Sequence, residues 1–188
     1  QDYFVHTLGD YVRQTGAEVT TVRAGLAVSL LERPRPDLVF ISPGPGTPAD
    51  FGVPELVRLC MRLNLPVFGV CLGLQGIVEA CGGKLGVLDH PCHGRSSRIR
   101  CTQRGLFAGF PAEFVAGRYH SLYALPEALP SCLEVLARSA DDVIMAVAHR
   151  RRPVAAVQFH PESILTLGDD LGRKLIRQVV EQLAGRGA

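Results

Sequence analysis

The stretch PVFGVCLGLQG, residues 66–76, decides the fold because it joins a short apolar run to a helical pattern through a tight turn. The run over 65–70 is continuous, as expected for a strand buried on both faces. Gly69 and Gly73 flank Cys71 in the pattern G-x-C-x-G, and glycines permit a turn that leaves no room for neighbouring Cβ atoms. We therefore expect Cys71 to lie between a buried strand and the first turn of a helix.

Strands and helices alternate on both sides of this unit. Such an alternation predicts an α/β fold with an open, mostly parallel sheet that is flanked by helices. Gly16 marks the end of the first helix, and Gly82 and Gly83 close the helix after Cys71. The expected strands are 17–23, 38–41, 65–70 and 154–159, and the expected helices are 4–15, 53–63, 72–83 and 171–183.

The pattern changes at about Arg98, where short candidate strands follow one another with turns between them. This arrangement predicts a small antiparallel extension of the sheet. The expected strands lie around Ile99 and at 114–116, 133–136 and 143–147. Without a linker, a repeat or a low-complexity segment, we expect residues 1–188 to form a single domain.

Composition excludes several classes of protein. The 188 residues are 47% hydrophobic and carry a net charge of +2, with Arg150 to Arg152 as the one run of basic residues, so we expect no nucleic-acid partner. No apolar stretch reaches the roughly 18 residues that cross a bilayer, and residues 1–15 lack a leader pattern. The six cysteines are scattered without a C-x-x-C pair, which favours reduced thiols and a cytoplasmic location.

Cys71 has two interpretations, because a free cysteine is also a common buried residue. A helix that begins directly after it favours the thiolate, and the carboxyl ends of strands in open α/β sheets are where ligands bind. A nucleophile needs a base, and the base needs an orienting group. His160 and Glu162 stand two apart after the run VAAVQF, with Pro161 between them, so we expect a triad of Cys71, His160 and Glu162.

Acyl transfer also needs donors for a developing oxyanion. The stretch SPGPGTP follows the strand at 38–41, and Gly44 and Gly46 can present their backbone N–H groups there. Leu72 can offer a further N–H at the start of a helix. An ordinary turn is the alternative for the Pro/Gly cluster, whereas a phosphate loop is disfavoured because no G-K-[ST] follows the glycines.

Four stretches together, SPGPGTP, GVCLGLQ, GRYHSL and VQFHPESILT, resemble the class I (triad-type) glutamine amidotransferases over essentially the whole chain. This resemblance implies a flavodoxin-like fold and hydrolysis of the glutamine side-chain amide through a thioester, with ammonia passed to a partner synthase. It implies that Cys71 is the nucleophile, His160 the base and then the acid, and Glu162 the orienting carboxylate. The residues implied to hold glutamine and the oxyanion are Gly44, Pro45, Gly46, Leu72, Gln75, Ser121 and Leu122.

Within this family the motifs resemble the glutaminases that serve chorismate-using synthases, with anthranilate synthase first. Aminodeoxychorismate synthase and the phenazine-pathway synthases are the alternatives. The resemblance implies no cofactor in this domain, since Mg²⁺ belongs to the synthase part. Its implied partners are L-glutamine and the chorismate-using synthase, with no nucleic acid and no membrane.

The chain departs from the family pattern at its start and in one loop. Family members begin with a strand that ends in an NYDSF-like stretch, whereas this sequence starts at QDYF with Tyr3 in place of the usual serine. Because that strand would be central in the sheet, we expect the residues given to be part of a longer chain. In HPCHGRSSRI, Arg95 replaces the lysine of the family's H-G-K-x-S loop.

Three alternatives to this function were open from the sequence. One is another cysteine hydrolase of α/β fold. It would share the base His160 and the strand-to-helix turn around Cys71, which we call the elbow. A second is a non-catalytic regulatory or scaffold subunit built on the same fold, although such a protein would be expected to have lost a member of the triad. The third is a metal site in the loop, which we do not expect because the spacing fits structural zinc poorly. Its candidate ligands are His90, Cys92, His93 and Cys101.

Overall fold

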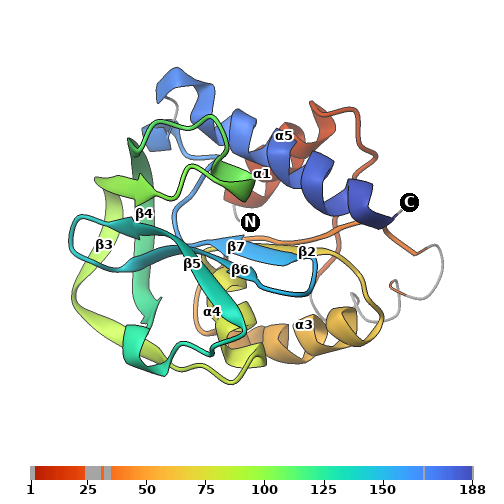
Figure 1. Ribbon diagram of the computed structural model, residues 1–188, viewed down its shortest axis with the longest axis horizontal. Coiled ribbons are helices and arrows are strands. Elements are labelled where there is room, and N and C mark those ends of the chain that lie inside the picture. Colours follow the sequence, from red (N-terminus) through yellow and green to blue (C-terminus); the bar gives the residue numbers. More distant parts are fainter. Residues whose placement is uncertain (1–2, 24–30, 32–34, 167, 188) are drawn as a thin grey trace.

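The computed structural model describes residues 3–23, 31, 35–166 and 168–187. One seven-stranded sheet has the order β1-β2-β7-β6-β5-β3-β4 (Figure 1). The strands are β1 (Val39–Ile41), β2 (Val67–Val70), β3 (Leu85–Cys101), β4 (Glu113–Ala124), β5 (Leu133–Ser139), β6 (Ile144–His149) and β7 (Val154–Val157). The helices are α1 (Tyr3–Arg13), α3 (Val53–Arg62), α4 (Leu72–Ala80) and α5 (Leu171–Leu183).

The sheet is parallel at one end and antiparallel at the other. β1, β2 and β7 form the parallel part, and β6, β5, β3 and β4 continue it through antiparallel pairings. Following these pairings across the sheet, β1, β2, β7, β5 and β4 all run in the same direction. The predicted fold class, an open α/β sheet with an antiparallel extension, is confirmed.

Helices cover both faces of the sheet, with α1 and α5 on one side and α3 and α4 on the other (Figure 1). Each side has its own apolar core. β2 and β7 lie between these cores, and every residue of both strands is buried. Continuous apolar runs therefore form the central strands, because a strand covered on both faces has no side for polar residues.

Most helix and strand predictions agree with the structure. α4 ends at Ala80, and Gly82 adopts φ +91°, the left-handed conformation expected of a residue that ends a helix. Gly16, with φ +90°, follows the end of α1 in the same way. The four strands predicted after Arg98 correspond to β3, β4, β5 and β6.

The strand predicted at 17–23 is wrong, because these residues adopt no regular secondary structure. A strand needs a neighbour to accept its backbone hydrogen bonds, and β1 pairs only with β2 among the described residues. Ala17 and Val19 instead pack against the core beneath α1 and α5. Apolar burial is thus retained without strand pairing.

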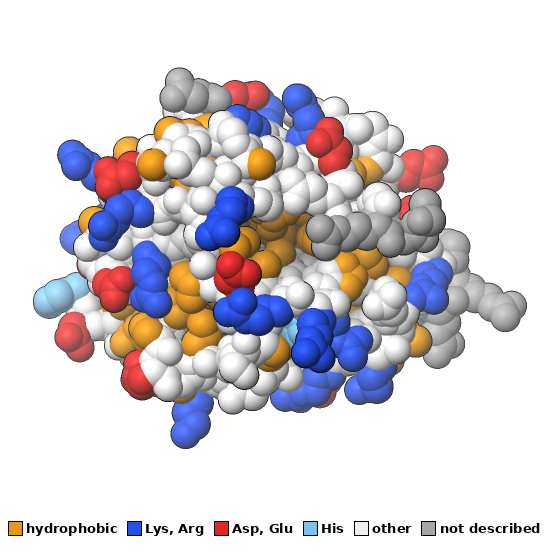
Figure 2. All heavy atoms as spheres, viewed as in Figure 1, with side chains coloured by type: hydrophobic (Ala, Val, Ile, Leu, Met, Phe, Trp, Pro, Cys, Tyr) orange, Lys and Arg blue, Asp and Glu red, His pale blue; other side chains and the backbone are white. Residues whose placement is uncertain are grey.

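The surface carries no single dominant charge in the view of Figure 2, where basic and acidic side chains are interspersed with apolar ones. Across the described residues, no helix combines the length and apolar character needed to span a membrane.

Candidate active site

The elbow that carries Cys71 is held in a strained conformation by close backbone packing. Cys71 adopts φ 53° and ψ −98°, outside the regions that non-glycine residues favour. A Cβ atom on Gly69 would lie 2.5 Å from the backbone carbon of Gly73, and one on Gly73 would lie 2.7 Å from the carbonyl oxygen of Ile41. Only glycine fits at both positions, so the pattern around Cys71 is a steric requirement of this turn.

The elbow places Cys71 at the carboxyl end of the two central strands. Its backbone N–H donates to the carbonyl of Val157, the last residue of β7, at 2.8 Å. α4 begins at the next residue, so the positive end of the helix lies beside the sulfur. The side chain is buried, with 5% of the residue exposed. The helix start beside the sulfur distinguishes this position from that of an ordinary core cysteine.

His160 and Glu162 form a buried pair just beyond β7. The Nδ1 atom of His160 lies 2.8 Å from Oε1 of Glu162, and both side chains are almost fully buried. Because the carboxylate accepts a hydrogen bond at Nδ1, Nε2 is left to accept a proton. Nε2 has no hydrogen-bond partner among the described residues. The backbone of His160 is bonded to Gly117 and to Thr166, which fixes the position of the ring.

The electrostatics of His160 favour its charged form. Burial lowers the pKa of this imidazole, but its interactions with the neighbouring Cys71 and Glu162 outweigh burial and raise the pKa to about 9. The rings of Phe4 and Tyr119 lie 4.7 and 4.9 Å from the imidazole and exclude solvent from it. The site is therefore suited to a thiolate beside an imidazolium.

A pocket of about 110 Å³ opens in front of Cys71. It brings together the residues for which the sequence predicted substrate contacts, with the exception of Leu72, which is buried at the start of α4. A Cβ atom on Gly44 would lie 3.1 Å from Cδ2 of Leu72, so the Gly44 loop packs on the elbow. The residues that line the pocket are Gly44, Pro45, Gly46, Cys71, Gln75, His93, Tyr119, His120, Ser121 and Leu122.

Sequence reasoning assigned four residues of this region no part in glutamine chemistry. Three of them, His93, Tyr119 and His120, line the pocket, and the fourth, Gln158, contacts the sulfur of Cys71 at 3.4 Å. Tyr119 and His120 belong to the motif GRYHSL, and Gln158 belongs to VQFHPESILT. Their place in those motifs was the signal available, because their spacing along the chain does not reveal contact with Cys71.

His120 differs from His160 in charge. Its Nε2 accepts a hydrogen bond from Nε of Arg118 at 3.1 Å, so its Nδ1 donates to the carbonyl of Leu122 at 2.8 Å. Burial and the positive charge of Arg118 lower the pKa of His120 to about 4. His120 is therefore neutral near pH 7 and supports the wall of the pocket at Leu122.

A second, larger pocket of about 300 Å³ contains none of the residues proposed for catalysis. It is lined by residues such as Thr102, Arg104, Glu134 and Arg152. We place the candidate site at the smaller pocket, because Cys71 lines it and the His160–Glu162 pair lies next to Cys71.

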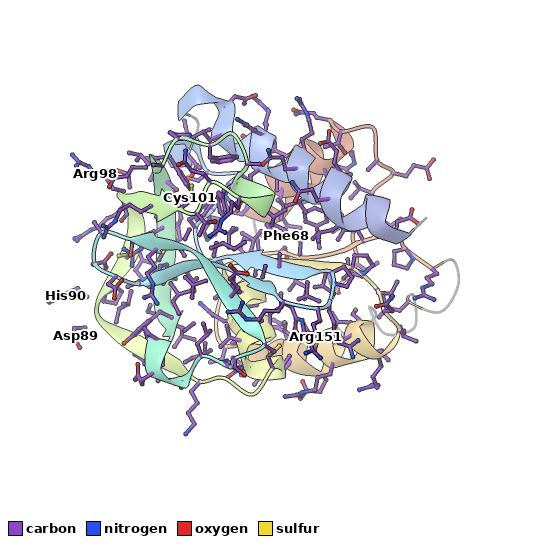
Figure 3. The ribbon with its side chains drawn as sticks, in the orientation of Figure 1. Phe68, Asp89, His90, Arg98, Cys101 and Arg151 are labelled. Carbon is purple, nitrogen blue, oxygen red and sulfur yellow. The ribbon has the colours of Figure 1, made fainter. Side chains whose placement is uncertain are left out.

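The loop cluster considered as a metal site does not form one ligand set. His90 and Cys101 both lie on β3, and Figure 3 shows them at separate places along it. Eleven residues of extended chain span about 35 Å, far more than a coordination sphere.

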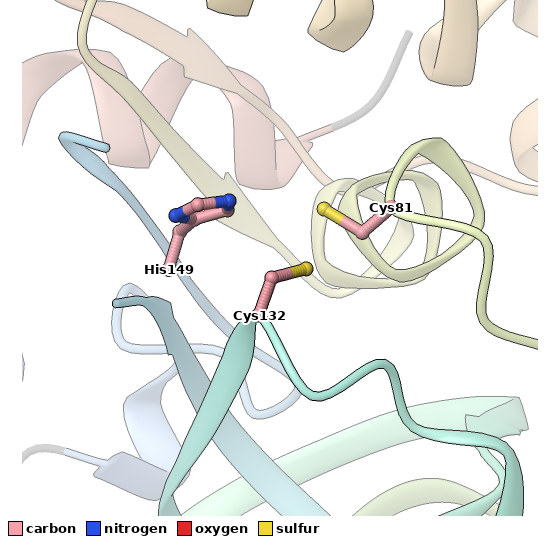
Figure 4. Close-up of side chains that lie close together, drawn as sticks. All are labelled: Cys81, Cys132 and His149. Atoms are coloured by element: carbon pink, nitrogen blue, oxygen red, sulfur yellow. The ribbon is translucent and has the colours of Figure 1, made fainter. Parts of the chain in front are cut away.

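A different trio does meet in space, at the far end of α4. The sulfurs of Cys81 and Cys132 and a ring nitrogen of His149 lie within 4.8 Å of one another, and the imidazole is turned toward the two thiols (Figure 4). However, Nδ1 of His149 accepts hydrogen bonds from the backbone N–H groups of Arg151 and Arg152, at 3.1 Å each. Nε2 then carries the proton, whereas a histidine that ligates a metal through Nε2 donates a hydrogen bond from Nδ1. The trio therefore does not fit a metal ion in this arrangement.

Comparisons with known proteins show the family to which the chain is similar. A profile described as "Glutamine amidotransferase class-I" matches residues 1–179. "Anthranilate synthase" of Azospirillum brasilense is 55% identical over 183 residues, which are 97% of this chain and 25% of that protein. "Anthranilate synthase component 2" of Methanocaldococcus jannaschii is 42% identical, with 96% of this chain and 92% of that protein covered. "Aminodeoxychorismate/anthranilate synthase component 2" of Bacillus subtilis is 36% identical, with the same coverage.

Among solved structures, a putative GMP synthase protein from Thermoplasma acidophilum superposes with a TM-score of 0.82. It covers all of this chain and 91% of its own, and at 23% identity the likeness concerns the fold. The chain spans a quarter of the Azospirillum protein and nearly all of the Methanocaldococcus protein. With a buried Cys-His-Glu constellation at the elbow and a profile match over most of its length, the chain belongs to the class I glutamine amidotransferase family.

Proposed function

We propose that this chain is the glutaminase of an anthranilate synthase, which hydrolyses L-glutamine and passes the ammonia to a chorismate-using synthase. The observation that carries the chemistry is the His160–Glu162 pair, 2.8 Å apart and buried behind the elbow of Cys71. The printed names of the Azospirillum and Methanocaldococcus relatives support anthranilate synthase as the enzyme served.

In the proposed first step, His160 takes the thiol proton of Cys71 at Nε2, and the sulfur attacks the side-chain carbonyl carbon of glutamine. Glu162 stabilises the imidazolium through Nδ1. The oxyanion of the tetrahedral intermediate accepts hydrogen bonds from backbone N–H groups of the Gly44–Gly46 loop and from Leu72. The N–H of Leu72 is free for this role, because the first N–H groups of a helix have no partner within the helix.

When the tetrahedral intermediate collapses, the C–N bond breaks and His160 protonates the departing ammonia. Water, deprotonated by His160, then attacks the thioester, and glutamate leaves as the sulfur is released. Gln75, Ser121 and Leu122 line the pocket and are proposed to hold the substrate. These steps use side chains of this chain and water, and we assign any Mg²⁺ requirement to the synthase part.

A synthase partner follows from the chemistry of ammonia. At neutral pH free ammonia becomes ammonium, which is no longer a nucleophile, so its transfer must avoid bulk solvent. The Bacillus relative, whose printed name includes aminodeoxychorismate, supports a second candidate in which the synthase makes that product.

The test compares wild type with Cys71→Ala in the full-length protein or with its synthase bound, with chorismate as substrate. We expect the variant to lose glutamine-dependent anthranilate formation by at least about 10³-fold and to retain formation driven by ammonium salt. Cys81→Ala, at the other end of α4, serves as the matched control and should keep both activities. Glutamate formation without anthranilate would favour the second candidate, and no hydrolysis of glutamine by wild type would refute the proposal.

A further inference from the structure

Gln158 is a buried polar residue that the proposed mechanism leaves without a role. It has no exposed surface, and it lies two residues before His160. Its backbone N–H donates to the carbonyl of Met145 at 2.8 Å, which holds the residue against β6. Its side-chain Nε2 lies 3.4 Å from Sγ of Cys71. A buried amide is costly unless both its ends are paired, so its partners define what it does.

The orientation of this amide follows from a chain of contacts that begins at a backbone carbonyl. The carbonyl of Leu122 can only accept, so the atom of Gln75 at 3.1 Å from it must be the nitrogen Nε2. The same Nε2 lies 3.4 Å from the side chain of Gln158, which must therefore present its oxygen Oε1 there. The opposite end of the Gln158 amide is then the NH₂ group. Turning either amide over would place two donors or two acceptors face to face.

An N–H group is consequently directed at the sulfur of Cys71. A thiol that donates its proton to His160 still has lone pairs to accept this hydrogen bond. After proton transfer the sulfur is negatively charged, and hydrogen bonds to a charged acceptor are stronger than those to a neutral one. The contact from Gln158 therefore favours the thiolate and limits the rotation of the Cys71 side chain.

We infer that Gln158 stabilises and orients the attacking sulfur of Cys71, with Gln75 and the carbonyl of Leu122 as the positioning groups that keep its N–H directed at that sulfur. This role deepens the proposed glutaminase function and rests on it. It also links the pocket wall to the nucleophile, because Leu122 and Gln75 line the pocket in which glutamine would bind.

The test measures how fast iodoacetamide alkylates Cys71 as a function of pH, by mass spectrometry of the peptide that contains it. The protein is full-length or bound to its synthase, without glutamine or chorismate. Gln158→Met keeps the length of the side chain and removes the N–H. We expect the midpoint of the pH profile to rise by about one unit, with alkylation about tenfold slower at each pH well below the midpoint. Gln75→Met should shift the midpoint in the same direction by less.

Gln182→Met is the matched control, since Gln182 also donates from its amide to a carbonyl, that of Gly105, but lies on α5. It should keep the wild-type profile. If Gln158→Met folds cooperatively and keeps the wild-type profile, the inference is overturned. If Gln158→Met does not fold, Gln75→Met decides: a raised midpoint supports the inference, and an unchanged one overturns it. Because alkylation needs no substrate, this result is independent of whether the protein hydrolyses glutamine.

Discussion

The two ends of α4 each hold a cysteine near a histidine, but the hydrogen bonds of the two histidines differ. Just before the first turn, Cys71 lies next to His160. Just after the last turn, Cys81 lies next to Cys132 and His149 (Figure 4). Glu162 accepts a hydrogen bond from Nδ1 of His160, which leaves Nε2 as a base. Backbone N–H groups donate to Nδ1 of His149, so its Nε2 already carries a proton.

The charges at the two ends also differ. The start of a helix favours a thiolate and its end disfavours one. The pKa of His160 is raised to about 9 by its contacts with Cys71 and Glu162. At the other end, burial and the neighbouring Cys132 raise the pKa of Cys81 to about 12, and burial with the charges of Arg152 and Arg151 lowers the pKa of His149. A cysteine near a histidine is therefore suited to the proposed chemistry only where a further partner leaves a ring nitrogen to accept the proton.

The largest expected effect on activity comes from removing the carboxylate that bonds to His160, because His149 has no such partner in the hydrogen bonds described above. Glu162→Gln keeps the size of the side chain but removes the negative charge that selects the proton on Nδ1. We expect kcat for glutamine hydrolysis to fall by about 10²- to 10⁴-fold, with a much smaller change in KM. Steady-state glutamate release measures this effect. Glu181→Gln, an exposed change on α5, is the control, and a Glu162→Gln variant with wild-type kcat would contradict the proposed role of the carboxylate.

Alanine substitutions of the glycines near the two ends of α4 should differ in how much they lower the free energy of unfolding. Gly69→Ala would bring a Cβ atom to 2.5 Å from the backbone of Gly73, so the elbow must shift. We expect a loss of about 1–3 kcal/mol in the free energy of unfolding, with loss of glutaminase activity. Gly82→Ala meets no atom within 4 Å and should cost about 1 kcal/mol for its positive φ alone, with activity retained. Urea unfolding measures both variants, and equal losses would contradict the steric account.

His160 and His149 should make the free energy of unfolding depend on pH in opposite directions. The raised pKa of His160 means that its contribution is fully present below about pH 6.5, the unfolded value, and is lost as the pH rises through about 9. We expect this loss to be about 3 kcal/mol and to be smaller in His160→Gln. The lowered pKa of His149 means that its contribution is present above about pH 6.5 and is lost as the pH falls through its folded value.

Urea unfolding across pH 5–10 measures both dependences. The matched pair His160→Gln and His149→Gln should flatten the alkaline and the acidic side of the stability profile respectively, with the His149 effect the smaller. A His160→Gln variant that loses stability above pH 7 as steeply as wild type would contradict the assignment of the raised pKa.

Short-range patterns were enough to predict much of the site. His160 and Glu162 are two residues apart in extended chain, so their side chains leave on the same side whatever the rest of the fold does. The glycines around Cys71 are local as well, because they relieve contacts within one turn and with the neighbouring strand. The alternation of apolar strands and amphipathic helices likewise predicted the α/β class.

Only the tertiary structure decided the contacts of Gln158 and the pairing of residues 17–23. Both depend on how segments that are distant in the sequence align. Gln158 reaches Cys71 across 87 positions and Gln75 across 83, so neither contact could be read from spacing. The run 17–23 has strand character but no strand beside it among the described residues, so its pairing could not be judged locally. The sequence by itself determined which side chains could do chemistry at the carboxyl edge of the sheet. Only the packing decided which ring nitrogen is free and where the amide N–H groups point, since both depend on partners brought together by the fold.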